Sequence, residues 1–412
     1  MDKISFIIPS RDNLRYLKWC YNSIRKNLGD EHEICCGDDS SSDGTWEWLQ
    51  EQSKVDKNLK TYKVESDNRR GLVLLYDELI RHCATNEVVM IFHADMYACP
   101  NLDKEVFKYL EKGKVVTVTR IEPSLHPPGP EKCLADYGVE PEEFDEDKLL
   151  SELKNFEDKT KITDGCFAPW AIYKEDFIRV GGHDRLFAPT SREDSDIFGR
   201  FVLHGYEFIQ TWGSFVYHLT SRGSRFNPAG GGEVGKDSPE WQWSNNKNVR
   251  NYIRKWGGMV SHSSTLHPQV KPKYDIGFEP INVDEKLLKV LEPWCANLKI
   301  SEWRPWVNDY IESESKEVLD VFYTTPQTPK EKIPNGIISG KFVDELTNDV
   351  QISFDCRFLN PNNFQILTKM HEIINDSGEV GEFELDIFKI KINKINNIVN
   401  ENLQVSNNIY GV

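Results

Sequence analysis

The chain has 412 residues, 39% of them hydrophobic and 28% charged, a balance typical of folded globular proteins and not of disordered ones. Its formal net charge of −16 argues against general binding to nucleic acid, and no run approaches the roughly 20 apolar residues of a membrane helix. The nine cysteines are odd in number and form no C-x-x-C pair, which favours buried reduced thiols over disulfides or a zinc site. Together with an N-terminus that lacks a signal-peptide pattern, this predicts a cytoplasmic protein.

Strand-like and helical segments alternate through the first 120 residues. The predicted strands are 4–10, 32–39, 59–65, 87–95 and 114–120, and the predicted helices are 12–28, 45–52, 71–84 and 102–113. This alternation predicts an α/β fold with a mostly parallel sheet flanked by helices. Ligands bind such sheets at the carboxyl ends of the strands, so polar residues directly after each strand are the first candidates for a site.

The rest of the chain predicts a helix over 193–204, which Ser191 could cap, and a strand over 206–220. A Ser- and Pro-containing stretch at 261–273 is the expected linker between a catalytic domain, 1–260, and a C-terminal accessory domain, 274–412. In the accessory domain we expect helices over 285–311 and 363–375. Strands are expected over 350–359 and 383–392, giving a small α+β fold without a recognisable motif.

Carboxylates follow two of the predicted strands. Asp38 and Asp39, in CGDDSSSDGT, could cap the next helix or could bind a base and ribose. His93-Ala94-Asp95 ends a very apolar strand, where an imidazole and a carboxylate could hold a borderline metal such as manganese. The alternative is a strand-ending turn in which Asp95 caps the helix that starts near Asn101.

Two later segments also allow a structural or a functional reading. The acids of EDSD (193–196) either complement the helix dipole or include a general base. His218 ends a predicted strand and is either structural or a metal ligand. A locally basic stretch, 201–256, is either a chance fluctuation or a binder of anions, and it contains Arg222 and Arg225.

The order and spacing of these motifs resemble those of family 2 of the inverting, nucleotide-sugar-dependent glycosyltransferases, which have the GT-A fold. The matching segments are FIIPSRDN, DDSSSDGT, a helix that begins at Gly71, the metal motif altered to His93-Ala94-Asp95, GGHDRLF, EDSD and His218. The resemblance covers roughly residues 3 to 256 and does not reach the accessory domain. Where the family usually has Asp, this chain has His93, so one negative charge is lost and affinity for magnesium should fall.

The resemblance implies a role for each matching position. The donor nucleotide would be held by Pro9, Ser10, Arg11, Asp38, Asp39, Arg70 and Gly71. A divalent metal, Mn²⁺ in preference to Mg²⁺, would be bound by Asp95 with His218 as a possible further ligand. His93 could be another ligand or could instead face the donor sugar. Asp194 would be the catalytic base. The candidates for contact with the acceptor or the diphosphate are Glu193, Trp170, Trp212, Arg222 and Arg225, with core packing an equal alternative for the two tryptophans.

The implied reaction moves a sugar from a nucleoside-diphosphate sugar, with a UDP-sugar the expected donor, to an acceptor hydroxyl with inversion. The acceptor could be a glycan, a lipid-linked sugar or another hydroxyl compound. One alternative is a non-catalytic nucleotide-sugar or glycan-binding protein on a degenerate GT-A scaffold. Another is a transferase acting on modified DNA bases, which the acidic composition disfavours. A nucleotidyltransferase would carry a glycine-rich loop after the first strand, whereas this chain has PSRDN.

Overall fold

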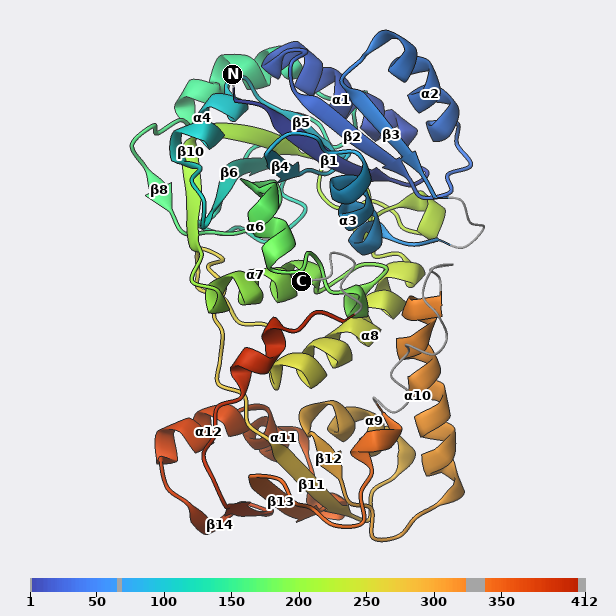
Figure 1. The fold of residues 1–412 in the computed structure, drawn as a ribbon, viewed down its shortest axis with the longest axis vertical. Coiled ribbons are helices and arrows are strands. Elements are labelled where there is room, and N and C mark those ends of the chain that lie inside the picture. The colour runs from blue at the N-terminus through green and yellow to red at the C-terminus, as the bar shows by residue number, and fades with distance from the viewer. Residues whose placement is uncertain (1, 65–68, 324–337, 407–412) are drawn as a thin grey trace. The chain divides into compact units, whose positions relative to one another are not determined.

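The computed structural model describes residues 2–64, 69–323 and 338–406, coloured along the chain in Figure 1. They form two compact units. The first comprises Met1–Asn245, His262–Gln269 and Val405–Val412, and the second comprises Asn246–Ser261 and Val270–Gln404. No helix among the described residues is both long enough and apolar enough to cross a membrane.

One large sheet forms the centre of the first unit. Its strands follow the order β3-β2-β1-β4-β9-β6-β10-β5, with β7 beside β6 and β8 beside β10. The strands are β1 (Ile4–Ser10), β2 (Glu33–Asp38), β3 (Leu59–Lys63), β4 (Val88–Ile91), β5 (Met96–Ala98), β6 (Lys114–Glu122), β7 (Lys132–Leu134), β8 (Ile162–Thr163), β9 (Trp170–Tyr173) and β10 (Glu207–His218). Because β1, β2, β3 and β4 are parallel, the carboxyl ends of β1, β2 and β4 meet at one edge.

Helices cover both faces of this sheet, with α1 and α4 on one side and α3 and α6 on the other (Figure 1). The helices that begin in the first unit are α1 (Leu14–Leu28), α2 (Thr45–Val55), α3 (Leu72–His82), α4 (Leu102–Tyr109), α5 (Glu146–Glu152), α6 (Lys174–Arg179), α7 (Glu193–Leu203) and α8 (Pro239–Trp256). In α1, Leu17, Tyr21 and Ile24 recur at helical spacing and are buried, as expected of an amphipathic helix on a sheet. The predicted α/β class is confirmed.

Two local predictions in this unit were wrong. The strand predicted over 87–95 ends at Ile91, and the chain turns before Met96–Ala98 returns as β5, antiparallel to β10. Ser191 does not cap α7, because Arg192 occupies the N-cap position and the Ser191 hydroxyl instead donates to the side chain of Asn245. The prediction of free cysteines is confirmed, since all nine are unpaired and only Cys133 is not buried.

A second sheet, in the order β12-β11-β13-β15-β14, forms the second unit together with the second half of α8 and four further α-helices among its described residues. Its elements are β11 (Ile276–Ile281), α9 (Glu285–Leu291), β12 (Asn297–Leu298), α10 (Pro305–Tyr323), β13 (Val350–Asp355), α11 (Pro361–Thr368), α12 (Met370–Ser377), β14 (Gly381–Leu385) and β15 (Phe388–Ile392). The α+β prediction is confirmed. The single helix predicted over 285–311 is instead α9, a 3-10 turn, β12 and the start of α10, and the strand predicted over 383–392 is a hairpin.

The division of the chain at 261–273 stays a prediction. In the structure, the border between the compact units falls inside α8, at Asn245–Asn246, and residues 262–269 belong to the first unit. The second half of α8 carries Arg250 and Arg254, whose carboxylate partners come from residues 292–317. Cutting the chain after residue 260 would therefore separate two largely buried arginines from their counter-ions.

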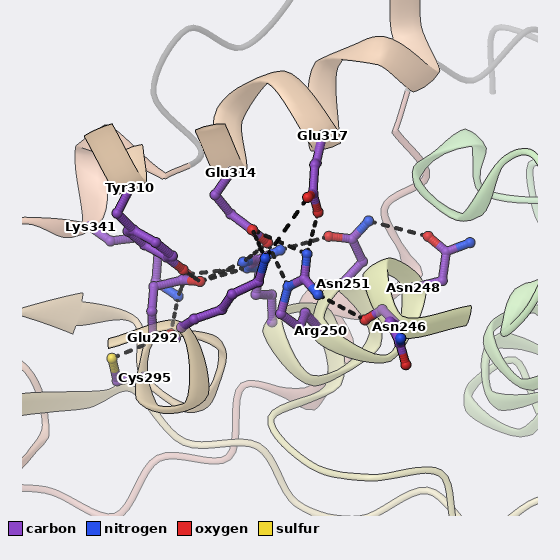
Figure 2. A network of polar contacts seen from close by, with 12 residues as sticks. Asn246, Asn248, Arg250, Asn251, Glu292, Cys295, Tyr310, Glu314, Glu317 and Lys341 are labelled. Carbon is purple, nitrogen blue, oxygen red and sulfur yellow. Dashed lines mark hydrogen bonds and ion pairs between the residues drawn. The ribbon is translucent and has the colours of Figure 1, made fainter. Parts of the chain in front are cut away.

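These arginines belong to a buried network of charges in the second unit, drawn in Figure 2. Its centre is Glu292, which is fully buried and accepts hydrogen bonds from Arg254, Tyr310 and Lys341. Glu314 accepts from Arg250 and Arg254, and Glu317 pairs with Arg250. Burial alone would raise the pKa of Glu292, but Lys341 and Arg254 hold it well below its usual range.

We expect Glu292→Ala to lower the free energy of unfolding of this unit by about 3 kcal/mol, because it leaves Arg254 and Lys341 buried without their carboxylate. The matched control is Glu302→Ala, which removes an exposed carboxylate paired only with the surface residue Arg304 and should change stability by less than about 1 kcal/mol. Denaturant unfolding monitored by circular dichroism measures both. Equal effects of the two substitutions would contradict a stabilising role for the network.

Candidate active site

A cavity of about 220 Å³ opens at the sheet edge where β1, β2 and β4 end. Residues that directly follow these strands line it, together with the first turns of α3 and the end of β10. The lining side chains include Pro9, Ser10, Arg11, Asn13, Asp39, Arg69, Leu72, Leu75, Tyr76, His93, Asp95, Arg120, His218 and Ser221. Most of the positions predicted for a donor and a metal therefore lie around one cavity.

His93, Asp95 and His218 form a cluster in this cavity whose possible ligand atoms all lie within 4.8 Å of one another. The early end of β4 places His93 and Asp95 in a turn, and the pairing of His218 with Met96 brings the end of β10 beside that turn. One carboxylate and two imidazoles suit a divalent ion of borderline softness. The Nε2 atom of His218 is buried without a hydrogen-bond partner and lies 3.5 Å from the Asp95 carboxylate, so the residues fit a metal.

Glu122, at the carboxyl end of β6, completes this cluster and was missed by the sequence analysis. Its carboxylate lies 2.8 Å from Nδ1 of His218, which leaves Nε2 directed at Asp95. Carboxylates in this position orient metal-binding histidines in many proteins. The available signal was the end of the predicted strand over 114–120, where Glu122 follows at the sheet edge that carries the other candidates.

The charges of this cluster are strongly coupled. Burial opposes protonation of His218, but Asp95 and Glu122 outweigh it and raise the pKa of His218 to about 9. Burial would raise the pKa of Asp95, yet the two histidines hold it well below its usual range. Burial lowers the pKa of His93 to about 4.

The predicted nucleotide side of the cavity is held by Asp39. Its two carboxylate oxygens accept the backbone N–H groups of Arg70 and Gly71, each at 2.8 Å, and so fix the start of α3 against the end of β2. Gly71 has a φ of +81°, and a side chain there would collide with Pro189. Pro9, Ser10 and Arg11 line the cavity directly.

Residues 5–181 match the model of the family described as Glycosyl transferase family 2. This N-terminal part of the chain is similar to a family 2 glycosyltransferase domain. The assignment confirms the resemblance and the GT-A fold class predicted from the motifs. No curated protein matches the chain.

The solved structures that align with part of this chain include the following two. A crystal structure of GalNAc-T7 with UDP, GalNAc and Mn²⁺ has 15% sequence identity and a TM-score of 0.45, and the alignment covers 62% of this chain and 48% of that one. The mannosyltransferase PcManGT from Pyrobaculum calidifontis, in complex with GDP-Man and Mn²⁺, has 17% identity and a TM-score of 0.40, with 61% and 63% covered. The match thus spans less than two thirds of either of those proteins.

The predicted base, Asp194, lies in the first turn of α7, next to Glu193 and beyond the segment that matches the family model. Burial outweighs the nearby charges of His183 and Arg120 and raises the pKa of Asp194, and burial together with the Asp194 charge raises the pKa of Glu193. Asp194 also interacts electrostatically with Tyr76, and both Tyr76 and Arg120 line the cavity.

Four of the predicted nucleotide, acceptor and diphosphate residues do not line the cavity because their side chains are engaged elsewhere. Asp38 is buried and accepts the N–H of Ser41, and Arg70 lies 3.7 Å from Glu78. The buried guanidinium of Arg222 donates to two backbone carbonyls. The backbone N–H of Arg222 donates to the Asp95 carboxylate. Arg225 forms a two-point pair with Asp237.

The two tryptophans are packed in the protein interior. Trp170 is fully buried against Phe177, Phe198 and Phe201, so it is a core residue, as the alternative prediction stated. It has no exposed surface that an acceptor could contact. Trp212 is also buried and donates its indole N–H to Thr163. Any aromatic surface for an acceptor must therefore come from other residues.

We expect Glu122→Gln to weaken Mn²⁺ binding by about 10- to 100-fold, because the amide no longer stabilises the required orientation of His218. Isothermal titration of the variant with Mn²⁺ measures this. Asp103→Asn is the matched control, since Asp103 makes the same type of contact with His32, outside the cavity. Unchanged Mn²⁺ affinity in Glu122→Gln would contradict the orienting role.

Proposed function

We propose that this protein transfers a glycosyl group from a nucleoside-diphosphate sugar to an acceptor hydroxyl, with inversion at the anomeric carbon. The observation that carries the proposal is the shared cavity, in which the His93, Asp95 and His218 cluster lies beside Pro9, Ser10 and Asp39 at the carboxyl edge of a family 2 domain. A UDP-sugar is the proposed donor and a glycan or lipid-linked sugar the proposed acceptor.

In this proposal, two groups of cavity residues bind the nucleotide and the divalent cation. Pro9, Ser10, Arg11 and Asp39 hold the nucleotide where the strands end. The cluster of His93, Asp95 and His218 would hold a divalent cation, Mn²⁺ in preference to Mg²⁺, which supplies positive charge for the diphosphate as it leaves.

Asp194 acts as the base in this proposal. It takes the proton of the acceptor hydroxyl while the acceptor oxygen bonds to the anomeric carbon and the bond from that carbon to the diphosphate breaks. A carboxyl whose pKa is raised toward the working pH is well suited to accept a proton. Glu193, beside it, is the proposed contact with the acceptor.

The C-terminal unit is proposed to recognise the acceptor or support assembly, since none of the cavity-lining residues comes from 274–404. The proposal as a whole is tested by thermal-shift measurements with UDP- and GDP-sugars in the presence of Mn²⁺, followed by a transfer assay with glycan acceptors. Detection of the product's anomeric configuration by NMR tests inversion. A protein that binds no nucleoside diphosphate with Mn²⁺ would overturn the proposal.

A second candidate is a nucleotide-sugar-binding protein without transferase activity. The change of the metal motif to His93-Ala94-Asp95 favours it, because the cluster has one carboxylate fewer than the motif usually has. Tight donor binding without transfer to any acceptor, and without slow hydrolysis of the donor, would select this candidate.

A further inference from the structure

Two arginines share one carboxylate at the edge of the cavity. Arg11 follows β1, and Arg69 lies just before the turn that begins α3. Nη1 of Arg11 is 3.1 Å from Oε1 of Glu240, in the first turn of α8, and Nη1 of Arg69 contacts the same oxygen. The Glu240 carboxylate therefore lies between two guanidinium groups, of which Arg11 is also 3.7 Å from Asp12 and Arg69 3.6 Å from Asp39.

Both arginines line the cavity that contains the His93, Asp95 and His218 cluster. They also line a smaller neighbouring cavity, together with Glu240, Asn227 and Ser238. The side chains of Arg11, Arg69 and Glu240 are 28%, 20% and 34% exposed. The shared carboxylate thus lies at an accessible boundary and not in the protein core, so another anion can reach the arginines.

The position of Arg69 relates it to the proposed nucleotide site. Its Nε atom is 3.6 Å from the Asp39 carboxylate and has no hydrogen-bond partner among the residues that the structure describes. Burial and the nearby charge of Arg11 lower the pKa of Arg69 to about 10, so it remains charged at neutral pH. Its neighbour Arg70 is directed at Glu78 and does not line the cavity.

We infer that Arg69 and Arg11 form the subsite for the diphosphate of the donor, and that Glu240 occupies this subsite in the ligand-free protein. The inference rests on the proposed function and adds a role for two residues, Arg69 and Glu240, that the motifs did not indicate. A diphosphate offers several oxygens and at least two negative charges, so it matches two guanidinium groups better than one carboxylate does. The inference also replaces the role that the motifs suggested for Arg222 and Arg225, since neither of these residues lines the cavity.

Donor binding then displaces Glu240 from the arginines. The carboxylate is a built-in competitor, and it lowers the apparent affinity for the nucleoside diphosphate by the free energy needed to break its two ion pairs. The nucleoside, which carries no phosphate, does not compete with Glu240. This difference between ligands separates competition at the subsite from a general effect of Glu240 on folding.

The test compares Glu240→Gln with Glu233→Gln by isothermal titration with UDP and GDP in the presence of Mn²⁺, and by NMR titration with uridine and guanosine. Glu233 is exposed, pairs only with Lys236 and does not line the cavities, so its substitution controls for the change in net charge. We expect Glu240→Gln to tighten nucleoside-diphosphate binding at least about fivefold and to leave nucleoside binding unchanged. The control should bind like the unsubstituted protein.

A third variant tests the arginine directly. Arg69→Gln should weaken diphosphate binding by about tenfold or more and leave nucleoside binding unchanged. Unchanged or weaker diphosphate binding in Glu240→Gln, with an unchanged melting temperature, would overturn the inference and leave the proposed function standing. A lower melting temperature of Glu240→Gln, together with weaker binding of both the nucleoside diphosphate and the nucleoside, would show that Glu240 only stabilises the fold. That result would also overturn the inference. Failure of the unsubstituted protein to bind either diphosphate would overturn the proposed function itself.

Discussion

Replacing Asp194 with asparagine should lower glycosyl transfer by about 10²-fold or more while leaving donor affinity unchanged. Asparagine keeps the shape and the hydrogen-bonding capacity of the side chain but cannot accept the acceptor's proton. Because burial raises the pKa of Asp194 in the folded protein, activity should fall on the acidic side as the pH drops through that raised value. The residual activity of Asp194→Asn should not show this fall at low pH.

The raised pKa of Asp194 also determines whether a rise in pH increases or decreases the free energy of unfolding. A carboxyl whose pKa is higher in the folded than in the unfolded state binds its proton more tightly when folded. Stability is therefore lost as the pH rises from the unfolded pKa toward the folded one. At neutral pH, Asp194→Asn should leave the melting temperature unchanged or raise it. Melting curves and initial rates between pH 5 and 9 measure both effects.

The neighbouring carboxylates provide controls on the same helix. Asp196 forms a buried ion pair with Arg200, at 2.9 Å, so Asp196→Asn should lower stability and preserve the turnover of the folded fraction. Glu193→Gln should cost less turnover than Asp194→Asn. Near-normal turnover in Asp194→Asn would remove Asp194 as the base.

Removing the metal should abolish most of the activity. We expect excess chelator, or Asp95→Asn, to lower transfer by about 10²-fold or more, because the diphosphate then leaves without a compensating cation. Asparagine is preferable to alanine here, since Asp95 also accepts the N–H of Arg222 and an oxygen at that position preserves the turn. Activity should return with Mn²⁺ more readily than with Mg²⁺, because two of the three candidate ligands are imidazoles.

His93 offers a further control on metal choice. His93→Asp restores the carboxylate that the family usually has at this position. The substitution should therefore bring the affinity for Mg²⁺ closer to the affinity for Mn²⁺. Titrations of His93→Asp and Asp95→Asn with Mn²⁺ and Mg²⁺ measure the affinity for each metal, and transfer assays at a fixed donor concentration measure the activity. Full activity in excess chelator, with Asp95→Asn unaffected, would exclude a metal-dependent mechanism. An unchanged preference in His93→Asp would indicate that His93 is not a ligand.

The helix and strand pattern of residues 4–122 could be predicted from the sequence because its signals are local. Apolar residues in α1 recur at the helical spacing, and the short apolar runs of β1 and β4 end in polar residues. Since parallel strands end at the same edge, the approach of Asp39 to Asp95 follows from the order of the elements alone. His218 required the resemblance, because β10 reaches that edge through a pairing with β5 that no local signal indicates.

Sequence by itself thus determined the fold class, the positions at the strand ends and the absence of paired cysteines, all of which depend on residue type and spacing. Only the tertiary structure decided which charges meet. The contact of Glu122 with His218, and that of Glu240 with Arg11 and Arg69, join segments 96 to 229 residues apart. It also decided that Trp170 is core, that Arg222 is buried in backbone contacts and that Asp194 has a raised pKa. Burial and ion pairing depend on what surrounds a side chain in space, and that is set by distant parts of the chain, not by its neighbours in sequence.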